Sequence, residues 1–244
     1  MGSQRSLLVH ALVRRDHPGS VSGSSRVAVG PVAAACTPFT AGAAAGVRQL
    51  KAHAALVQAL CAAGPVVPFR FGTLVPHASW LRAHLRQQGK DYAKLLDQLE
   101  GLVEIAVTVS GKEDRVVRHL LDAEPELRAL AASARSSGLP GQVEFGEHVA
   151  AAYEGFLLRE AGAVMERLAE EAVRVAPRAP TQGAIRASFL VSTIAFERFE
   201  GLAQRLQQDS DDRLRVRLTG PLPPYSFVDA EQRPMPPRAS AWAS

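Results

Sequence analysis

The sequence predicts an α+β protein whose C-terminal part is a modified ferredoxin-like sandwich with long helices. Three observations lead to this fold class. Apolar and polar residues alternate over 102–110, which is typical of a half-buried strand. Apolar residues recur on one stripe of a helix over about 143–175. A strand–helix–strand succession follows over 184–220, and together these elements predict helices packed on a sheet.

The chain is predicted to form two domains, because its 244 residues exceed the roughly 100–200 residues of a usual single domain. We expect an N-terminal α+β domain over 1–98 and a C-terminal ferredoxin-like α+β domain over 99–228. Residues 229–244 are rich in proline and polar side chains, so we expect a flexible tail there.

The N-terminal elements are separated by glycine and proline turn signals. A run of strand length comes first, then a second β-like segment, then an amphipathic helix that ends at Gly64-Pro65, a β-like stretch that contains Pro68, and two shorter helices. In order, these segments are 6–13, 25–35, 43–63, 65–75, 79–87 and 91–99.

The C-terminal elements begin with the strand at 102–110, which is followed by two helical segments interrupted at Pro125 and by a loop. The long helix then spans about 50 Å at roughly 1.5 Å per residue. A strand, an amphipathic helix and a second strand complete the domain. In order, the segments are 102–110, 112–134, 135–142, 143–175, 184–192, 195–208 and 212–220.

Composition and charge narrow the class of protein. With 47% hydrophobic and 21% charged residues, the chain has the composition of an ordinary globular protein. Its net charge is only +4 and its basic residues are interspersed with acidic ones, so no nucleic-acid partner is predicted. No stretch of about 20 apolar residues occurs, so no membrane is predicted as partner. Cys36 and Cys61 form no metal-binding pattern and favour free thiols in a cytoplasmic protein.

The sequence contains none of the common local signatures of catalysis: no phosphate-binding loop, no dinucleotide fingerprint, no nucleophile elbow and no HExxH. The seven histidines are scattered, and Glu197 and Glu200 are expected on a solvated helix surface. We therefore predict no catalytic residue, no metal and no cofactor.

The stretch "RLTGPLPPYSFV", Arg217 to Val228, ends the predicted ordered part. Its prolines lack backbone N–H donors and favour extended conformations, so this stretch is predicted to form a rigid arm. Tyr225 and Phe227 lie two residues apart, on one side of the arm if it stays extended. We expect these two rings to dock on the protein's own chain.

Three segments, in order, resemble the gas vesicle protein GvpL/GvpF family. They are "ALCAAGPVVPFRFGTLV" at 59–75, "LEGLVEIAVTVSG" at 99–111 and "LTGPLPPYSFV" at 218–228. The residues that carry the resemblance are Pro68, Arg70, Phe71, Gly72 and Thr73 in the first, Gly101 and Glu104 in the second, and Gly220, Pro221, Pro223, Pro224, Tyr225, Phe227 and Val228 in the third. The start "LLVHALV" and Leu222 depart from the family pattern.

The resemblance implies a non-enzymatic minor structural or assembly protein of gas vesicles, the gas-filled protein shells of the cytoplasm that provide buoyancy. It implies the small hydrophobic major shell protein as partner, with other minor gas vesicle proteins as further candidates. On this interpretation Arg70 holds its turn by hydrogen bonds to carbonyls, and the proline-rich arm anchors the two domains.

Two alternatives remain open at this stage. A phosphate-ligand-binding enzyme on an α+β scaffold would use Arg70, Thr73 and Arg217, which would have to converge on one pocket. A general homodimerising scaffold would use the 143–175 helix as its seam, and would associate with itself without any shell partner.

Overall fold

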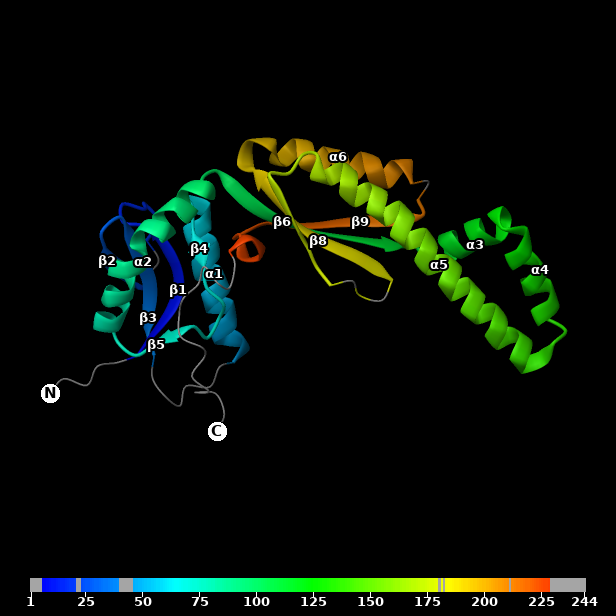
Figure 1. The fold of residues 1–244 in the computed structure, drawn as a ribbon, viewed down its shortest axis with the longest axis horizontal. Helices are drawn as coiled ribbons and strands as arrows, with labels where there is room; N and C mark the ends of the chain where they lie inside the picture. The colour runs from blue at the N-terminus through cyan, green and yellow to red at the C-terminus, as the bar shows by residue number, and fades with distance from the viewer. Residues whose placement is uncertain are drawn as a thin grey trace. The chain divides into compact units, whose positions relative to one another are not determined.

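The computed structural model describes residues 6–20, 23–39, 46–179, 181, 183–210 and 212–228. The chain divides into two compact units (Figure 1): the first combines Met1–Glu104 with Pro221–Ser244, and the second is Ile105–Gly220. The first unit thus includes the arm at 221–228, which the predicted division placed in the C-terminal domain. The predicted tail at 229–244 lies outside the described residues.

The sheet of the first unit has the order β2-β3-β1-β4, with β5 also paired to β1. Its strands are β1 (Leu7–Arg14), β2 (Ser25–Val29), β3 (Val32–Pro38), β4 (Val67–Pro68) and β5 (Leu74–Val75). All the pairings of this sheet are antiparallel. The predicted segment 25–35 is a hairpin rather than one strand, because Gly30 adopts a positive φ of 57° at the turn between β2 and β3.

Two helices flank this sheet. On one side, α1 (Val47–Ala63) buries Leu56 and Leu60 against alanine and valine side chains of β1 and β3. On the other side, α2 (Ala78–Gln98) passes close to Val32 through the buried Gly89. The prediction of two helices at 79–87 and 91–99 was wrong, because Gly89 interrupts the sequence pattern but fits a close helix–sheet contact.

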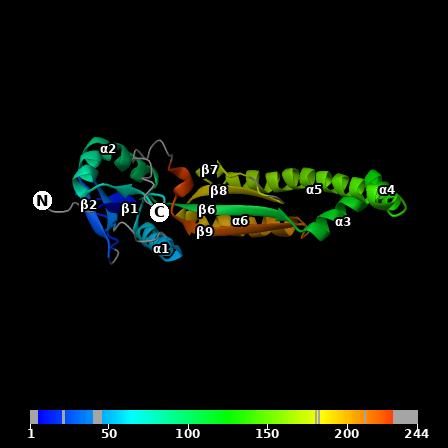
Figure 2. The same cartoon turned by 90° about the horizontal axis from the view of Figure 1, so that it is seen from below.

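The second unit contains its elements in the order β6 (Leu102–Gly111), α3 (Glu113–Ala123), α4 (Pro125–Ala134), α5 (Gly138–Ala169), β7 (Arg174–Pro177), β8 (Ala184–Ser192), α6 (Phe196–Asp209) and β9 (Leu214–Leu222). The sheet order is β7-β8-β6-β9, and β7 pairs with β8 in antiparallel fashion. Figures 1 and 2 show α5 and α6 on the same face of this sheet. The core between them includes Val107, Phe156, Phe189 and Phe199.

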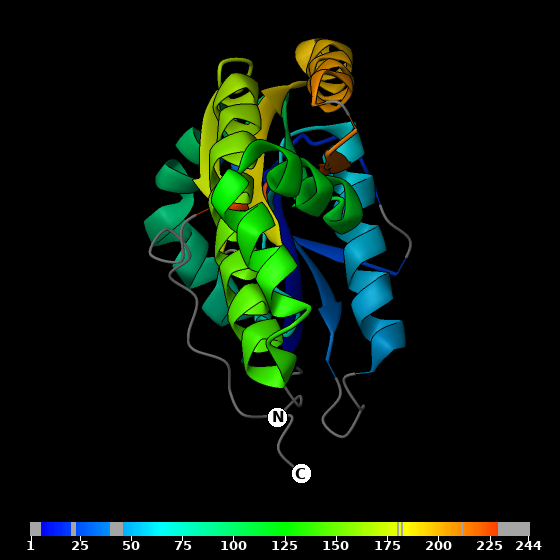
Figure 3. The same cartoon turned by 90° about the vertical axis from the view of Figure 1, so that its right-hand side faces the viewer.

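The long helix α5 differs from its predicted range of 143–175 at both ends. It begins at Gly138, inside the predicted loop, because Pro140 falls in the first turn, where a missing backbone donor is tolerated. It ends at Ala169, because residues 174–177 pair with β8 as strand β7. The first half of α5 lies beside α3 and α4 (Figure 3).

Helices and sheets in both units confirm the predicted α+β class. Among the helices of the described residues, none combines the length and the apolar character that crossing a membrane requires.

Candidate functional site

The turn of the first motif joins β4 to β5 and lies against β1. The backbone N–H and the hydroxyl of Thr73 both donate to the carbonyl oxygen of Arg70, at 3.2 Å and 2.8 Å. Gly72 adopts a φ of 89°, which L-residues with side chains rarely accept. The carbonyl of Thr73 accepts from the N–H of Val9, so the turn is fixed to the central strand.

The exposed Arg70 takes part in this turn through its backbone. Its guanidinium makes no hydrogen bond or ion pair with any residue that the structure describes. The structure therefore shows no hydrogen bond from the Arg70 side chain to the carbonyls of the turn, as the hypothesis required. The hydrogen bonds of Thr73 and the positive φ of Gly72 stabilise the turn instead.

A β-bulge in β1 turns His10 toward α1. The register of β1 against β3 shifts between Val9 and Ala11, so one extra residue lies at this point of the strand. An extra residue reverses the alternation of side chains between the two faces. His10 therefore lies on the same face as Ala11, where it meets His53 of α1.

A chain of polar contacts runs through this face to the arm. His10 Nε2 lies 2.9 Å from the hydroxyl of Thr37, and its Nδ1 lies 2.8 Å from Nδ1 of His53. His53 Nε2 lies 3.2 Å from the hydroxyl of Tyr225. The ring of Phe71 meets the His53 ring edge-on at 5.6 Å. Motif residues from the turn and from the arm thus meet at one buried histidine.

The protonation of the two histidines is set mainly by burial. Desolvation, and then the neighbouring His53, lower the pKa of His10 to about 4. Burial also lowers the pKa of His53. At neutral pH both rings are therefore uncharged, and one Nδ1 donates its proton to the other.

A second contact joins the arm to β6. Glu104 is 1% exposed, and its two carboxylate oxygens accept from Ser226, one from the backbone N–H at 2.8 Å and one from the hydroxyl at 2.7 Å. Gln58 of α1 donates its side-chain amide to the carbonyl of Pro221 at 3.0 Å. Glu104 of the second motif and the arm of the third motif are therefore in direct contact.

The arm does not stay extended as predicted. Residues Tyr225–Phe227 form one turn of 3₁₀ helix, because Phe227 N–H donates to the carbonyl of Pro224. Phe227 is 1% exposed, and Pro223 and Pro224 are buried. Tyr225 and Phe227 consequently lie in different environments. The hydroxyl of Tyr225 contacts His53, whereas the ring of Phe227 is buried in the core.

Besides Arg70, three motif residues lie at the surface. Gly101 has a φ of 66°, and the space around its missing side chain is open. Gly220 and Pro221 are exposed at the end of β9. Pro68, by contrast, is buried where β4 pairs with β1.

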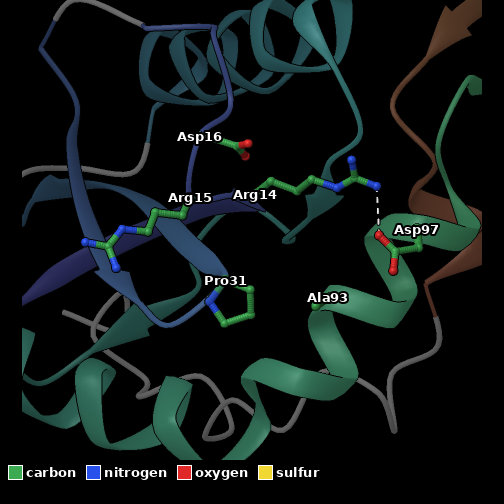
Figure 4. Close-up of a pocket in the computed structure, with 6 residues that line it drawn as sticks. All are labelled: Arg14, Arg15, Asp16, Pro31, Ala93 and Asp97. Carbon is green, nitrogen blue, oxygen red and sulfur yellow. Dashed lines mark hydrogen bonds and ion pairs between the residues drawn. The ribbon is translucent and has the colours of Figure 1, made fainter.

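Two of the hollows among the described residues of the first unit bear on the site. One, of about 330 Å³, is bordered by His10, Thr37, Gln49 and His53 together with Gly23 and apolar residues of α1 and β1. The other, of about 670 Å³, is bordered by Arg14, Arg15, Asp16, Pro31, Ala93 and Asp97 (Figure 4).

In the second hollow, Arg14 reaches across to Asp97 at 2.7 Å and also contacts Glu100 at 2.9 Å, whereas Arg15 points away from it (Figure 4). The positive charge of Arg14 is therefore already compensated, and this hollow offers no convergent set of ligand-binding groups.

The residues of the phosphate-binding alternative do not border either hollow. The hydroxyl of Thr73 is engaged by the carbonyl of Arg70, and Arg217 belongs to the other unit. Among the described residues, no group of three or more His, Cys, Asp or Glu could hold a metal ion. Burial raises the pKa of Cys36 to about 12 and that of Cys61 to about 11, so neither thiol is an activated nucleophile.

The arm and the turn were predicted from the sequence, but the roles of His10 and His53 were not. These two residues lie 43 positions apart. A polar residue inside the apolar run "LLVHALV", and a histidine on the buried stripe of an amphipathic helix, were the signals available.

Together, the fold and the site define a two-unit α+β protein in which three sequence motifs meet around a docked proline-rich arm. The model of the gas vesicle synthesis protein GvpL/GvpF family matches residues 19–229, and the chain belongs to this family.

Individual relatives agree with this assignment. The chain is 35% identical to gas vesicle protein F of Streptomyces sp. (strain CB03234) over 187 residues, which cover 75% of this chain and 78% of that protein. Its fold is similar to the crystal structures of GvpF from Microcystis aeruginosa and from Anabaena sp. PCC7120, with TM-scores of 0.70 for both. These two similarities cover 92% of this chain and 99% and 98% of those chains, at 16% and 18% identity, so they concern the fold.

Proposed function

We propose that this protein is a non-enzymatic minor structural or assembly protein of gas vesicles, which binds the hydrophobic major shell protein in the cytoplasm and assists vesicle formation. Membership of the gas vesicle synthesis family is the observation that carries this proposal. The motif residues support it, because those that are buried stabilise the fold and none of them joins a catalytic constellation among the described residues.

The proposal has a physical rationale. A shell subunit that exposes a large apolar surface before it polymerises is prone to off-pathway association. A helper that covers this surface reversibly limits such association. Other minor gas vesicle proteins are further candidate partners.

The long helix α5 is the surface that we assign to the shell protein. Leu139 and Val143 lie on the same stripe of α5 as Leu157 and Leu168, which pack in the core. Near the start of the helix, however, Leu139 is 73% exposed and Val143 is 54% exposed. An apolar surface of this kind fits an apolar partner.

We also propose that the second unit is a modified ferredoxin-like sandwich and that the two units are separate folding domains. In favour of the first point, the elements follow the order strand, helices, two strands, helix, strand, and the sheet order is β7-β8-β6-β9. The inserted helices α3 and α4 are the modification.

Co-purification of the tagged protein with the major shell protein tests the function. We expect capture by the wild type and at least a tenfold loss, or about 1.4 kcal/mol, in the variant Leu139→Gln/Val143→Gln. The arm variant Tyr225→Phe should capture the shell protein as the wild type does. No capture by a folded wild-type protein would reject direct binding of the shell protein.

A further inference from the structure

One face of the sheet in the second unit carries arginine side chains. Along β6, β8 and β9, the residues Val107, Phe189 and Leu214 point into the core under α5 and α6. Since side chains alternate between the faces of a strand, the residues between them lie on the opposite face. The arginines of that face are Arg174, Arg178, Arg186, Arg215 and Arg217.

Toward the start of β6 this face carries the buried Glu104, which accepts hydrogen bonds from Ser226, and β8 adds the buried Ser188 and Leu190; no other acidic residue of the described strands of this sheet lies on it. Its other positions include Thr108, Ser110 and Thr219. Arg215 and Arg217 are exposed, and neither guanidinium makes a hydrogen bond or ion pair with a described residue. Asp212 interacts electrostatically with Arg215, so Arg217 is the residue that presents positive charge without an ion-pair partner among the described residues.

The first half of α5 carries the opposite charge. Glu144, Glu147 and Glu154 are exposed and lie at helical spacing on one side, away from the residues that face α3 and α4. None of the three makes an ion pair with a residue in the described parts of the chain. The stretch 113–160 contains nine acidic residues and five arginines, a net −4, although the whole chain carries +4.

The spacings of the two charged sets match. At about 1.5 Å per residue, Glu147 lies roughly 5 Å from Glu144 and roughly 10 Å from Glu154 along the helix. Arg215 and Arg217 are about 7 Å apart along β9, and Arg186 lies two strands away, at roughly 10 Å. One helix lying across the sheet can therefore bring two or three glutamates to the arginines.

The glutamates cannot reach the arginines of their own sheet. The second half of α5 is fixed to the helix-covered face by Leu157, Val164 and Leu168. The arginines lie on the other face of the same sheet, so the two sets can meet only between two molecules.

We infer that this protein associates with a second copy of itself, the acidic row of α5 in one molecule (Glu144, Glu147 and Glu154) docking on the arginine face of the sheet in the next (Arg186, Arg215 and Arg217). The two surfaces are different patches, so the contact is head to tail. In such a dimer one molecule keeps its arginine face free and the other keeps its acidic row free, so assembly can continue beyond a dimer.

A single-stranded nucleic acid is the competing occupant of an arginine-bearing sheet. Nucleic acids bind such sheets by stacking bases on aromatic side chains. Phe189 of the strands and Phe199 of α6 are buried in the core instead, and Phe196 of α6 packs against that core. The chemistry of the face fits carboxylates better than bases.

Sedimentation velocity of the nuclease-treated full chain tests the inference. We expect concentration-dependent association at about 50 mM salt and at least a tenfold weaker association at about 500 mM, because salt screens exposed charges. A wild-type protein that stays monomeric at low salt would overturn the inference. Association that disappears on nuclease treatment would overturn it in favour of nucleic acid.

Two variants make the test specific. The face variant Arg215→Gln/Arg217→Gln and the row variant Glu147→Gln/Glu154→Gln should each be monomeric alone. Mixed in equal amounts they should form a 1:1 heterodimer, because one supplies an intact row and the other an intact face. Self-association of either variant at the wild-type level, or a mixture that stays monomeric, contradicts the head-to-tail contact.

Two matched variants serve as controls. Arg215→Lys/Arg217→Lys keeps the charge and should still associate. Arg48→Gln/Arg82→Gln removes two exposed arginines from α1 and α2 and should associate as the wild type does. Loss of association in this second control would show that net charge, and not the arginine face, governs the contact.

Discussion

Glu104 and Glu154 show how differently the two units use the same side chain. Glu104, in the first unit, is 1% exposed and accepts two hydrogen bonds from Ser226. Glu154, in the second unit, is exposed and forms no ion pair with a described residue. Glu104 thus holds the arm in place, whereas Glu154 is solvated at the surface of α5.

The difference has an energetic meaning. A buried polar group that loses its partner retains the full cost of its desolvation, whereas an exposed one is solvated by water. Substitutions in the first unit should therefore change the stability of the protein, and substitutions on α5 should change its associations.

The largest effect is expected for Glu104→Ala. The substitution leaves the N–H of Ser226 without its charged acceptor, so we expect the free energy of unfolding to fall by about 3 kcal/mol. Denaturant unfolding of both variants measures it. Glu154→Ala should change the unfolding free energy by less than about 0.5 kcal/mol, and equal effects in the two variants would remove the contrast.

The next effect concerns pH. The pKa of His10 is lowered to about 4 in the folded protein, below its ordinary value of 6.5, so the unfolded chain binds more protons between these two values. Stability is therefore fully present above pH 6.5 and falls as the pH decreases toward 4. The slope is on the order of 1.4 kcal/mol per pH unit for one excess proton.

Unfolding measured at several pH values checks this sign. His53 adds to the slope in the same direction, because burial lowers its pKa too. The variant His10→Asn has no ring to protonate, so its stability should depend less on pH between 6.5 and 4. An unchanged slope in this variant would contradict the assignment to His10.

A smaller effect is expected for Tyr225→Phe, which removes the hydroxyl that contacts His53 Nε2 at 3.2 Å. Loss of one neutral hydrogen bond should lower the unfolding free energy by about 1 kcal/mol. Tyr153→Phe in α5 is the matched control, because its hydroxyl bonds no described residue. An equal loss of unfolding free energy in both variants would show that the loss does not come from the hydrogen bond between Tyr225 and His53.

The smallest effect is expected for Arg14→Gln. Arg14 contacts Asp97 and Glu100, but these three side chains are 39%, 66% and 53% exposed. Exposed ion pairs typically contribute less than about 1 kcal/mol and are screened by salt. Thermal unfolding at low and high salt should show a small loss that disappears at high salt; a loss as large as that of Glu104→Ala would refute the role of burial.

Local patterns predicted much of the fold. The period-two alternation predicted a strand at 102–110, which the structure shows as β6 (Leu102–Gly111). The apolar spacing together with Gly64-Pro65 predicted a helix at 43–63, which the structure describes as α1 (Val47–Ala63). Pro125 separated α3 from α4, as expected of a residue that suits only the first turn of a helix. Short strands such as β7 were missed, because four residues carry too little periodicity.

The motifs that identify the family were visible in the sequence, but their arrangement was not. Glu104 and Ser226 lie 122 positions apart, and His53 and Tyr225 lie 172 positions apart. Periodicity describes neighbours along the chain and contains no information on such distant pairs. The bulge that turns His10 toward α1 likewise depends on the register of two strands.

By itself, the sequence determined the α+β class, the main helices and strands, the turn and arm motifs and the family to which the chain belongs, because each of these depends on residues close together in the chain. Only the tertiary structure decided that the arm docks on the His10–His53 pair and Glu104, that Gly89 continues a helix, and that the arginines and the glutamates of the second unit occupy separate surfaces. Those outcomes depend on packing between distant segments, where burial and the pairing of polar groups select one arrangement.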